Sequence, residues 1–503
     1  MQDHPQSALS ADRRRRELVD LGDSADVDVL VIGGGITGVG TALDAASRGL
    51  RTVLVDKHDL AFGTSRWSSK LAHGGLRYLA SGNVGIARES AVERGILMTR
   101  TAPHLVRALP QLVPLLPSVG RFANALVRTG FLAGDALRVT ARTPASVLPR
   151  SRRVDAEKAA RLAPAVRREG LRGGLLAYDG QLIDDARLVV ALARTAAAHS
   201  ATILTRVGAY DVTGDSARLR DELTGEELTI RARAVVNAAG VWAGQVDPDI
   251  RLKPSRGTHL VLPAELLGNP TAALTVPIPG ETNRFVFALP AQLGRVYLGL
   301  TDEAVDGAIP DVPVASDGEV DFLLDTVNTA LATPLSRSDV LGTFAGLRPL
   351  LDSGEGKTSD LSRNHAVLRS SNGVVSVVGG KLTTYRKMAQ DAVDAAIAAG
   401  ELTARACVTT NLPAVGADRT APRSLPPSLV ARYGSEAGIV ADAGDLTPIA
   451  DGIDVTHAEL AFAVSHEGAL DVDDLLDRRT RIGLVPGDRE RALPAAERAL
   501  NGS

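Results

Sequence analysis

The feature that most constrains the fold is a glycine-rich loop near the N-terminus, Gly33-Gly34-Gly35-Ile36-Thr37-Gly38. A β-branched run, Val27 to Ile32, precedes it, and a stretch suited to a helix, Ile36 to Arg48, follows it. Thr52 to Val55 is apolar again and predicts a second strand. The three segments predict a βαβ unit in which the G-x-G-x-x-G pattern stands where a dinucleotide binds.

The three glycines of the G-x-G-x-x-G pattern each have a physical reason in a dinucleotide-binding unit. Gly33 allows a tight turn, Gly35 lets the backbone approach a pyrophosphate, and Gly38 lets helix and strand pack closely. The N–H groups at the start of the helix then face the phosphates. Asp56 lies about 20 residues further on, where a carboxylate accepts hydrogen bonds from a ribose hydroxyl. We therefore expect dinucleotide binding.

Further alternation of helices and strands extends this pattern along the chain. A helix is predicted from Asp184 to Ala198 and a strand from Thr202 to Val207. Two later strands, Arg231 to Val236 and Val374 to Val378, end in small residues, and the second is followed by a helix to Ala399. Segments 284–289, 295–300 and 342–347 alternate like strands of an antiparallel sheet that faces a substrate. The cofactor domain is therefore predicted to be discontinuous in sequence.

Composition narrows the function classes. The 503 residues are 45% hydrophobic and 23% charged with a net charge of -3, which is typical of a soluble globular protein and does not favour nucleic acid as a partner. Cys407 is the only cysteine, so we expect no intrachain disulfide, no Cys-rich metal site and a cytoplasmic location. No uncharged apolar run approaches the ~20 residues that cross a bilayer, so any membrane contact is expected to be peripheral.

The ends of the chain are expected to differ from its middle. Arg13 to Arg16 form a basic run that is expected to lie in a solvated tail rather than on anionic lipid. Prolines and weak periodicity between 412 and 429 predict a linker. The expected domains are a mobile N-terminal extension at 1–26, a discontinuous cofactor domain with an interleaved β domain at 27–404, and a C-terminal helical domain at 405–503.

A second set of motifs carries a family resemblance. The run 63–70, Gly-Thr-Ser-Arg-Trp-Ser-Ser-Lys, offers hydroxyl groups that suit the phosphates and flavin ring of a long cofactor. The continuation from Ser68 to Leu79, which includes His73-Gly74-Gly75, resembles the flavin-proximal signature of the FAD-dependent, quinone-linked glycerol-3-phosphate dehydrogenases. Gly346-Leu347-Arg348-Pro349-Leu350 and the run 379–386, Gly-Gly-Lys-Leu-Thr-Thr-Tyr-Arg, resemble two further motifs of that family. The resemblance covers nearly everything from Val27 to Leu484.

The resemblance implies a fold and a reaction. The fold is an FAD-binding Rossmann-like domain of the amino-acid-oxidase and glutathione-reductase type, with an antiparallel β substrate domain and a C-terminal helical domain. The reaction is oxidation of sn-glycerol 3-phosphate to dihydroxyacetone phosphate, with FAD as cofactor and a membrane quinone as electron acceptor, and a homodimer is expected. The residues expected to contact FAD are Gly33, Gly35, Gly38, Asp56, Thr64, Ser65, Ser68, Ser69, Lys70, Gly240, Gly380, Lys381, Leu382 and Thr383.

Arginine is the side chain expected to bind a phosphorylated substrate, because a guanidinium group binds a phosphate with two charge-assisted hydrogen bonds. Arg348 stands in a strand-like run, and Arg363 follows a short way on. The resemblance places both on the substrate side of the site, together with Arg77.

Oxidation of a secondary alcohol by a flavin also needs a base for the hydroxyl proton. Histidine suits this role at neutral pH, and His73 and His259 are both candidates. Tyr78 is expected to orient the hydroxyl. Lys381, at the start of a predicted helix, is expected to stabilise negative charge that develops on the flavin.

Other functions share parts of this pattern. A peroxide-forming glycerol-3-phosphate oxidase differs only in what reoxidises the flavin. An amine or amino-acid oxidase binds a carboxylate and does not need the Arg348 motif. If the chain were a binding module without catalysis, the arginines and histidines would have no role. If it were an NAD-dependent dehydrogenase, the run from Thr64 to Tyr78 would have none.

Overall fold

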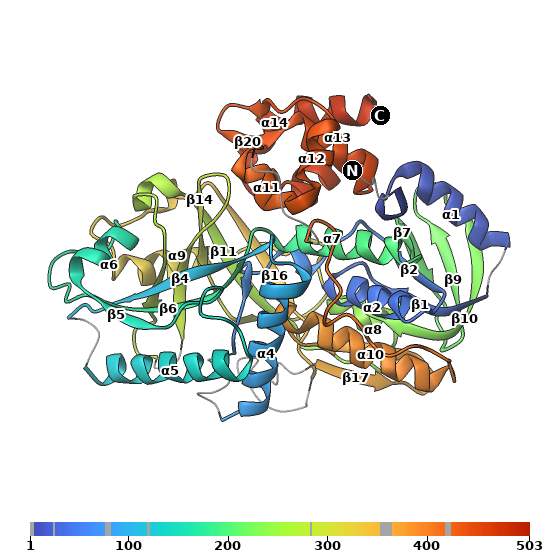
Figure 1. Cartoon of the computed structure of the whole chain (residues 1–503), viewed down its shortest axis with the longest axis horizontal. Helices are drawn as coiled ribbons and strands as arrows, with labels where there is room; N and C mark the ends of the chain where they lie inside the picture. The colour runs from blue at the N-terminus through green and yellow to red at the C-terminus, as the bar shows by residue number, and fades with distance from the viewer. Residues whose placement is uncertain are drawn as a thin grey trace.

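A computed structural model describes residues 5–23, 26–75, 82–117, 121–281, 284–352, 365–417 and 424–502. Figure 1 shows three parts. An α/β part and a β-rich part lie side by side, and the C-terminal helical part lies above the boundary between them. The chain crosses repeatedly between the first two parts, because each sheet takes its strands from separate stretches of the sequence.

The α/β part contains a mostly parallel sheet. In the described part of the chain its main strands stand in the order β17 (His365–Arg369), β18 (Val375–Gly379), β10 (Glu227–Asn237), β1 (Asp26–Ile32), β2 (Thr52–Asp56) and β7 (Thr202–Thr205). Strands β18, β10, β1, β2 and β7 run parallel, and Val31 of β1 pairs with both Leu54 and Val236. The carboxyl ends of these strands therefore meet at one edge, where a parallel sheet binds its ligand.

Helices cover this sheet. Helix α2 (Ile36–Ser47) packs between α7 (Asp185–Ala198) and α10 (Tyr385–Ala399), and their apolar faces share one core with the sheet. Asp184 caps α7 as predicted, with Oδ1 accepting from the N–H of Arg187 at 3.0 Å. The strand predicted to reach Val207 ends at Thr205 instead, because Arg206 has a φ of 57° and turns the chain into β8 (Val207–Tyr210). Strand β8 pairs with β9 (Ser216–Asp221), which joins the edge of β10.

The N-terminal segment differs from its expectation. Residues 11–23 form helix α1 (Ala11–Asp23), which packs against β7 and β10 instead of forming a mobile tail. Arg14 is buried, with its Nε donating to the carbonyl of Thr205 at 2.7 Å and its Nη2 2.5 Å from Oδ1 of Asp221. Leu21 joins the apolar core on this side of the sheet. A buried ion pair and an apolar anchor therefore hold a segment whose composition alone predicts a tail.

The β-rich part is built on a second sheet, largely antiparallel as the alternating segments predict. Its main path in the described residues is β15 (Glu303–Ala304), β11 (Ser255–Pro263), β14 (Arg295–Gly299), β13 (Phe285–Pro290), β12 (Ala273–Pro277), β4 (Val106–Pro114), β6 (Gly174–Leu182) and β3 (Leu71–Ala72). Strand β16 (Gly342–Arg348) pairs with β11, and β5 (Arg152–Val154) pairs with β6. The helices of this part are α4 (Val84–Ile96), α5 (Arg121–Thr140), α6 (Ala156–Leu162) and α9 (Asp317–Asn328).

The C-terminal part is mostly helical, with one short hairpin. Its elements are α11 (Pro427–Tyr433), α12 (Ala437–Asp442), β19 (Pro448–Ala450), β20 (Ile453–Thr456), α13 (His457–His466), a π-helical turn at Asp474–Arg479 and α14 (Pro486–Asn501). Its own apolar core includes Leu460, Leu475 and Ile482. No described helix is both long enough and apolar enough to span a bilayer.

Candidate active site

One large cavity, of about 1090 Å³, extends from the carboxyl edge of the parallel sheet to the inner face of the antiparallel sheet. Small-molecule sites usually measure roughly 300–1,000 Å³, so this cavity has room for an extended cofactor and a small substrate. The residues expected to serve the site that line this cavity are Gly33, Gly35, Asp56, Thr64, Ser65, Ser68, Ser69, His73, Gly240, His259, Arg348, Gly380, Lys381, Leu382 and Thr383.

The glycine-rich loop forms one end of the cavity. Gly33 has a φ of +115°, and a Cβ there would lie 2.6 Å from the carbonyl oxygen of Ala238. Gly38 does not line the cavity: a Cβ there would lie 1.8 Å from the carbonyl oxygen of Gly33, so its role is close packing of α2 on the loop. The N–H of Ile36, in the first turn of α2, donates to Oγ of Ser65 at 2.9 Å. This end therefore presents the start of a helix, lined with hydroxyl groups, to an anionic ligand.

Asp56 closes the same end at the tip of β2. Its Oδ1 accepts from the N–H of His58 at 2.7 Å, and its Oδ2 accepts from the N–H of Gly34 at 2.5 Å. Burial raises the pKa of Asp56 to about 6, although these two N–H groups lower it. A carboxylate here is placed to accept hydrogen bonds from a ribose.

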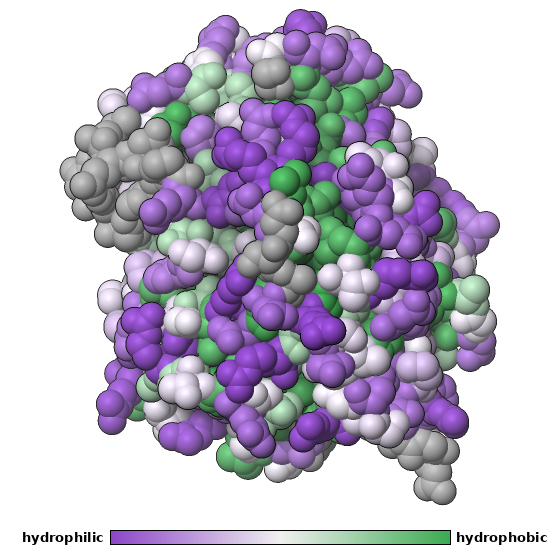
Figure 2. Space-filling view, turned by 90° about the vertical axis from the view of Figure 1, so that its right-hand side faces the viewer, coloured by the Kyte–Doolittle hydropathy of each residue, from purple (hydrophilic) through white to green (hydrophobic). Residues whose placement is uncertain are grey.

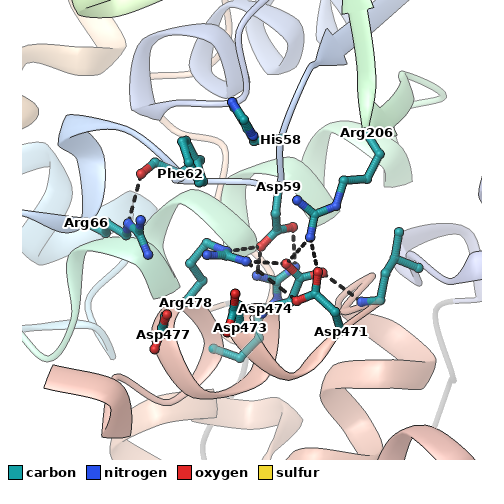
Figure 3. Close-up of polar contacts among 12 residues, drawn as sticks. His58, Asp59, Phe62, Arg66, Arg206, Asp471, Asp473, Asp474, Asp477 and Arg478 are labelled. Atoms are coloured by element: carbon teal, nitrogen blue, oxygen red, sulfur yellow. Dashed lines mark hydrogen bonds and ion pairs between the residues drawn. The ribbon is translucent and has the colours of Figure 1, made fainter. Parts of the chain in front are cut away.

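The loop that carries Thr64 to Ser69 is clamped by the C-terminal part. Asp59 is fully buried, and its Oδ2 lies 2.7 Å from both Nε of Arg478 and Nη1 of Arg479. Burial alone would raise the pKa of Asp59, but the two guanidinium groups hold it well below its usual range. Figure 3 shows Asp59 and Arg478 meeting Asp474 and the other charged residues of this cluster. Segments more than 400 positions apart are thereby joined beside the cavity.

Lys70 does not line the cavity, although we expected it to contact the cofactor. Its Nζ is buried and lies 2.9 Å from Oδ2 of Asp185, while also donating to the carbonyls of Arg66 and Ser68. A buried ammonium group needs a carboxylate, and Asp185 at the start of α7 supplies it. The expected cofactor role is therefore corrected to support of the loop from behind.

His259 stands at the other end of the cavity, on β11. Its Nε2 lies 2.9 Å from Oγ of Ser69, and its ring stacks on Phe344 with centroids 4.6 Å apart. Gly299 on the neighbouring strand makes room for the ring, because a Cβ there would lie 2.2 Å from the imidazole. Burial lowers the pKa of His259 well below its usual range, and the charges of Lys70 and Arg348 lower it further. The imidazole is therefore neutral at physiological pH.

Arg348 ends β16, the strand that pairs with β11, and lies opposite Ser255. Its guanidinium group donates to Oγ of Ser255 at 3.1 Å and to the carbonyl of Thr301 at 3.0 Å, and it lies 3.2 Å from Oδ1 of Asp302. A Cβ on Gly257 would lie 2.3 Å from Nη2, so a glycine on the adjacent strand again makes room. The guanidinium group lines the cavity while these partners fix its orientation.

His73 contributes a second imidazole to the cavity wall. Its Nδ1 lies 3.6 Å from Oδ2 of Asp179 on β6, and its side chain is 46% exposed. Oδ1 of Asp179 also accepts from Nη1 of Arg94 at 2.6 Å and from the N–H of Gly74 at 3.0 Å. Burial would raise the pKa of Asp179, but Arg94 and His73 lower it below its usual value. An ionised carboxylate therefore stands beside the imidazole.

The segment after β18 brings a lysine and more backbone to the cavity. Gly379 and Gly380 have φ values of 75° and 74°, in the left-handed region that favours glycine. Nζ of Lys381 donates to Oγ of Ser90 on α4 at 2.8 Å, and Oγ1 of Thr383 accepts from the N–H of His73 at 3.0 Å. This turn therefore connects α4 to the segment that carries His73.

Some expected site residues cannot be placed, and other residues were missed. Arg77, Tyr78 and Arg363 lie outside the described residues. Asp179 was missed, although a lone charged residue within the apolar strand 174–182 is a signal that points to it. Further lining residues not singled out beforehand are Phe62, Gln111, Tyr210, Thr275 and Phe287. Within the described residues, no cluster of three or more histidine, cysteine or acidic side chains is arranged to hold a metal ion.

Comparisons with known proteins agree with this architecture. Residues 28–386 match the model of the FAD dependent oxidoreductase family, and residues 407–501 match the C-terminal domain of alpha-glycerophosphate oxidase. Glycerol-3-phosphate dehydrogenase 1 of Mycobacterium tuberculosis is 65% identical, covering 98% of this chain and 99% of its own. Glycerol-3-phosphate dehydrogenase of Mycobacterium leprae is 37% identical, covering 95% of this chain and 85% of its own.

Solved structures show the same fold. The glycerol-3-phosphate dehydrogenase from Bacillus halodurans, complexed with FAD, superposes with a TM-score of 0.73 at 26% identity, covering 98% of this chain and 94% of its own. L-α-glycerophosphate oxidase from Mycoplasma pneumoniae has a TM-score of 0.58 at 17% identity, covering 77% of this chain and 97% of its own, and shares the fold. Fold and cavity together define an FAD-dependent oxidoreductase. Within that class, the chain belongs to the glycerol-3-phosphate dehydrogenase family, as the sequence motifs indicated.

The cavity fits FAD. The close approach at Gly33 leaves room for backbone but not for a side chain, which is what a pyrophosphate-binding turn requires. Nε1 of Trp67 and Nδ1 of His259 are buried without a hydrogen-bond partner in the described structure, and both residues line the cavity. Buried polar groups are normally satisfied, so these two atoms await partners from a bound molecule. The loop, Asp56 and the run from Thr64 to Ser69 are the residues that would hold the cofactor.

Proposed function

We propose that this chain oxidises sn-glycerol 3-phosphate to dihydroxyacetone phosphate with FAD and passes the electrons to a membrane quinone. The observation that carries the proposal is a single cavity with two distinct ends. One end has the dinucleotide loop, and the other has an arginine, a lysine and two histidines. The relatives named glycerol-3-phosphate dehydrogenase support the substrate.

Arg348 is proposed to bind the substrate phosphate. Its guanidinium group is oriented by Ser255, Thr301 and Asp302 before any ligand arrives, so little conformational entropy is lost on binding. A planar guanidinium matches the spacing of two phosphate oxygens. Arg77 and Arg363 remain predicted partners for the same phosphate.

FAD, when bound, supplies the acceptor for the hydride that leaves the carbinol carbon. The hydroxyl proton must go elsewhere, and we assign it to the imidazole of His73. The carboxylate of Asp179 stabilises the imidazolium that forms and fixes the orientation of the ring. The products are a ketone, a reduced cofactor and a protonated His73, so electrons and protons balance.

His259 is proposed to position rather than to accept the proton. The lowered pKa of its imidazole makes it a weak base, whereas a neutral ring offers hydrogen bonds to a hydroxyl or carbonyl oxygen. Lys381 also lines the cavity, and its cation is proposed to stabilise negative charge that develops during cofactor reduction. Two histidines thus take two roles because their surroundings differ.

The electron acceptor separates this proposal from the oxidase alternative. Flavin reduced anaerobically by sn-glycerol 3-phosphate is mixed either with a soluble ubiquinone or menaquinone analogue or with oxygenated buffer. Reoxidation at least about 100 times faster with the quinone supports the dehydrogenase, and rapid peroxide release instead identifies an oxidase. Reduction of the flavin by glycine or sarcosine but not by glycerol 3-phosphate would move the chain to the amine oxidases.

A further inference from the structure

Helix α4 lies at the boundary between the β-rich part and the α/β part (Figure 1). It packs on α5 and on the short turn Leu382–Thr384. Gly75 makes a close approach to α4 possible, because a Cβ there would lie 2.8 Å from Cα of Ala87 and 3.1 Å from Cβ of Ser90. The loop that carries His73 therefore packs directly against this helix.

One face of α4 contacts two charged groups of the site. Ser90 and Arg94 are four residues apart, so their side chains lie on the same face of the helix. Oγ of Ser90 accepts a hydrogen bond from Nζ of Lys381 at 2.8 Å. Nη1 of Arg94 donates to Oδ1 of Asp179 at 2.6 Å. The same helix therefore contacts both the cation and the carboxylate that have proposed roles in the reaction.

A separate ion pair fixes α4 to the segment that follows Lys381. Oε2 of Glu93 lies 2.8 Å from Nε of Arg386, and Oε1 lies 2.6 Å from Nη2. Both residues are buried, and a bidentate contact of this kind fixes geometry as well as charge. Arg386 belongs to α10, which begins four residues after Lys381. The packing of α4 against this segment therefore does not depend on Ser90, and loss of its hydroxyl should leave both elements in place.

The hydroxyl group of Ser90 is oriented before it meets the lysine. Ser90 is fully buried, and its Oγ donates to the carbonyl of Ile86 at 2.8 Å, one turn earlier in α4. A hydroxyl has one proton and two lone pairs. Since the proton is bound to Ile86, the oxygen presents a lone pair to the ammonium group of Lys381. Ser90 is therefore a fixed acceptor for this cation.

The position of Lys381 is unusual for a lysine. A lysine normally keeps its ammonium group in bulk water, and Figure 2 shows hydrophilic residues spread over the side on which α1, β9 and β10 lie in Figure 1. Lys381 instead lines the cavity, as do its neighbours Gly380 and Leu382. Its flexible stem allows the ammonium group many orientations, and a fixed acceptor selects one of them.

We propose that Ser90 is a positioning residue, whose hydroxyl holds the ammonium group of Lys381 in the orientation that stabilises negative charge on the reduced flavin. Ser90 does not line the cavity, so it acts through Lys381, which does. The inference rests on the proposed role of Lys381 beside the cofactor, and it names the group on α4 that sets the orientation of this cation.

The test is the midpoint potential of the flavin in the FAD-loaded protein, measured against a reference dye without glycerol 3-phosphate. Ser90→Ala should lower the equilibrium constant for reduction about threefold to tenfold, which is about 15 to 30 mV for two electrons. Lys381→Met should lower it about 100-fold or more, because the cation itself is lost. The double variant should have the potential of Lys381→Met, since Ser90 acts only through this lysine.

Two further variants separate positioning from a general effect on folding. Ser90→Cys fills the same space with a weaker acceptor and should also lower the potential. The matched control is Ser465→Ala, which removes the same contact to a carbonyl one turn earlier, that of Ala461 in α13. It should leave the potential unchanged.

An unchanged potential in Ser90→Ala, with a lowered one in Lys381→Met, would overturn the role of Ser90 and leave that of Lys381. Additive shifts in the double variant would also overturn it, because Ser90 would then act by another route. An unchanged potential in Lys381→Met would refute both roles. Since no substrate is present, failure of glycerol 3-phosphate to reduce the flavin would contradict the proposed reaction without changing these results.

Discussion

Nδ1 of His73 lies 3.6 Å from Oδ2 of Asp179, and the carboxylate is held in place by Arg94 and by the backbone of Gly74. This relationship distinguishes the two histidines of the cavity. His73 has an anionic partner in Asp179, whereas the ring of His259 contacts the hydroxyl of Ser69 and the ring of Phe344. Proton transfer is therefore assigned to His73.

His73→Asn should slow flavin reduction by glycerol 3-phosphate by about 100- to 10,000-fold, the usual contribution of a general base. Asp179→Asn should cause a smaller loss, because the imidazolium formed in proton transfer loses its anionic partner. Anaerobic stopped-flow absorbance measures both rates. His199→Asn, at the end of α7 and away from the cavity, is the control. A normal rate in His73→Asn together with a large loss in His259→Asn would transfer the base to His259.

Arg348→Ala should lower kcat/KM for glycerol 3-phosphate. The corresponding loss of transition-state stabilisation should be about 2 kcal/mol or more, in the range of charge-assisted hydrogen bonds. Gly257→Ala should give a similar defect without removing the charge, because its Cβ would displace the guanidinium group. Gly318→Ala, where a Cβ meets nothing within 4 Å, should leave the kinetics unchanged. Steady-state kinetics with a dye acceptor compares the three, and unaltered kinetics in Arg348→Ala would remove Arg348 from the site.

FAD affinity should depend on the protonation of Asp56. Since burial raises the pKa of this carboxyl to about 6, and an ionised carboxylate is the better acceptor for a ribose hydroxyl, affinity should fall about tenfold from pH 7 to pH 5. The same shift stabilises the apoprotein fully below about pH 4, and that contribution is lost as the pH rises through about 6. Fluorescence titration of apoprotein with FAD measures the affinity. Asp56→Asn should show a flat profile, and a parallel decline in this variant would contradict the assignment.

The ion pairs of Asp59 with Arg478 and Arg479 should contribute to both the stability of the fold and the retention of FAD. Asp59→Asn leaves Arg478 and Arg479 buried with less compensation, so the free energy of unfolding should fall by about 3–5 kcal/mol. FAD should also dissociate faster, because the loop from Phe62 to Ser69 loses its support. Asp471→Asn, whose side chain is 49% exposed in the same cluster, should cost less than about 1 kcal/mol. Equal effects of the two substitutions on denaturant unfolding would refute the clamp.

The cofactor half of the structure could be predicted from sequence because its determinants are local. The G-x-G-x-x-G loop, the strands beside it and the cap of α7 at Asp184 each depend on neighbouring residues, and the structure places them as expected. The antiparallel strands β13, β14 and β16 were found by their alternation.

Features that depend on distant partners were not predictable in the same way. The motif around Lys70 predicted a contact with the cofactor, yet its ammonium group forms an ion pair with Asp185, 115 positions away. Arg14 was assigned to a tail, yet Asp221 holds it 207 positions away. Buried ion pairs of this kind leave no periodic signal, so only the folded chain shows which of its 56 basic residues are structural.

The measurement that tests the central claim most directly is an anaerobic absorbance spectrum of the FAD-loaded protein before and after addition of sn-glycerol 3-phosphate. Loss of the visible flavin band, with dihydroxyacetone phosphate formed in a one-to-one ratio to flavin, is the expected result. A bound flavin that stays oxidised in the presence of excess glycerol 3-phosphate would leave the fold intact and contradict the assigned reaction.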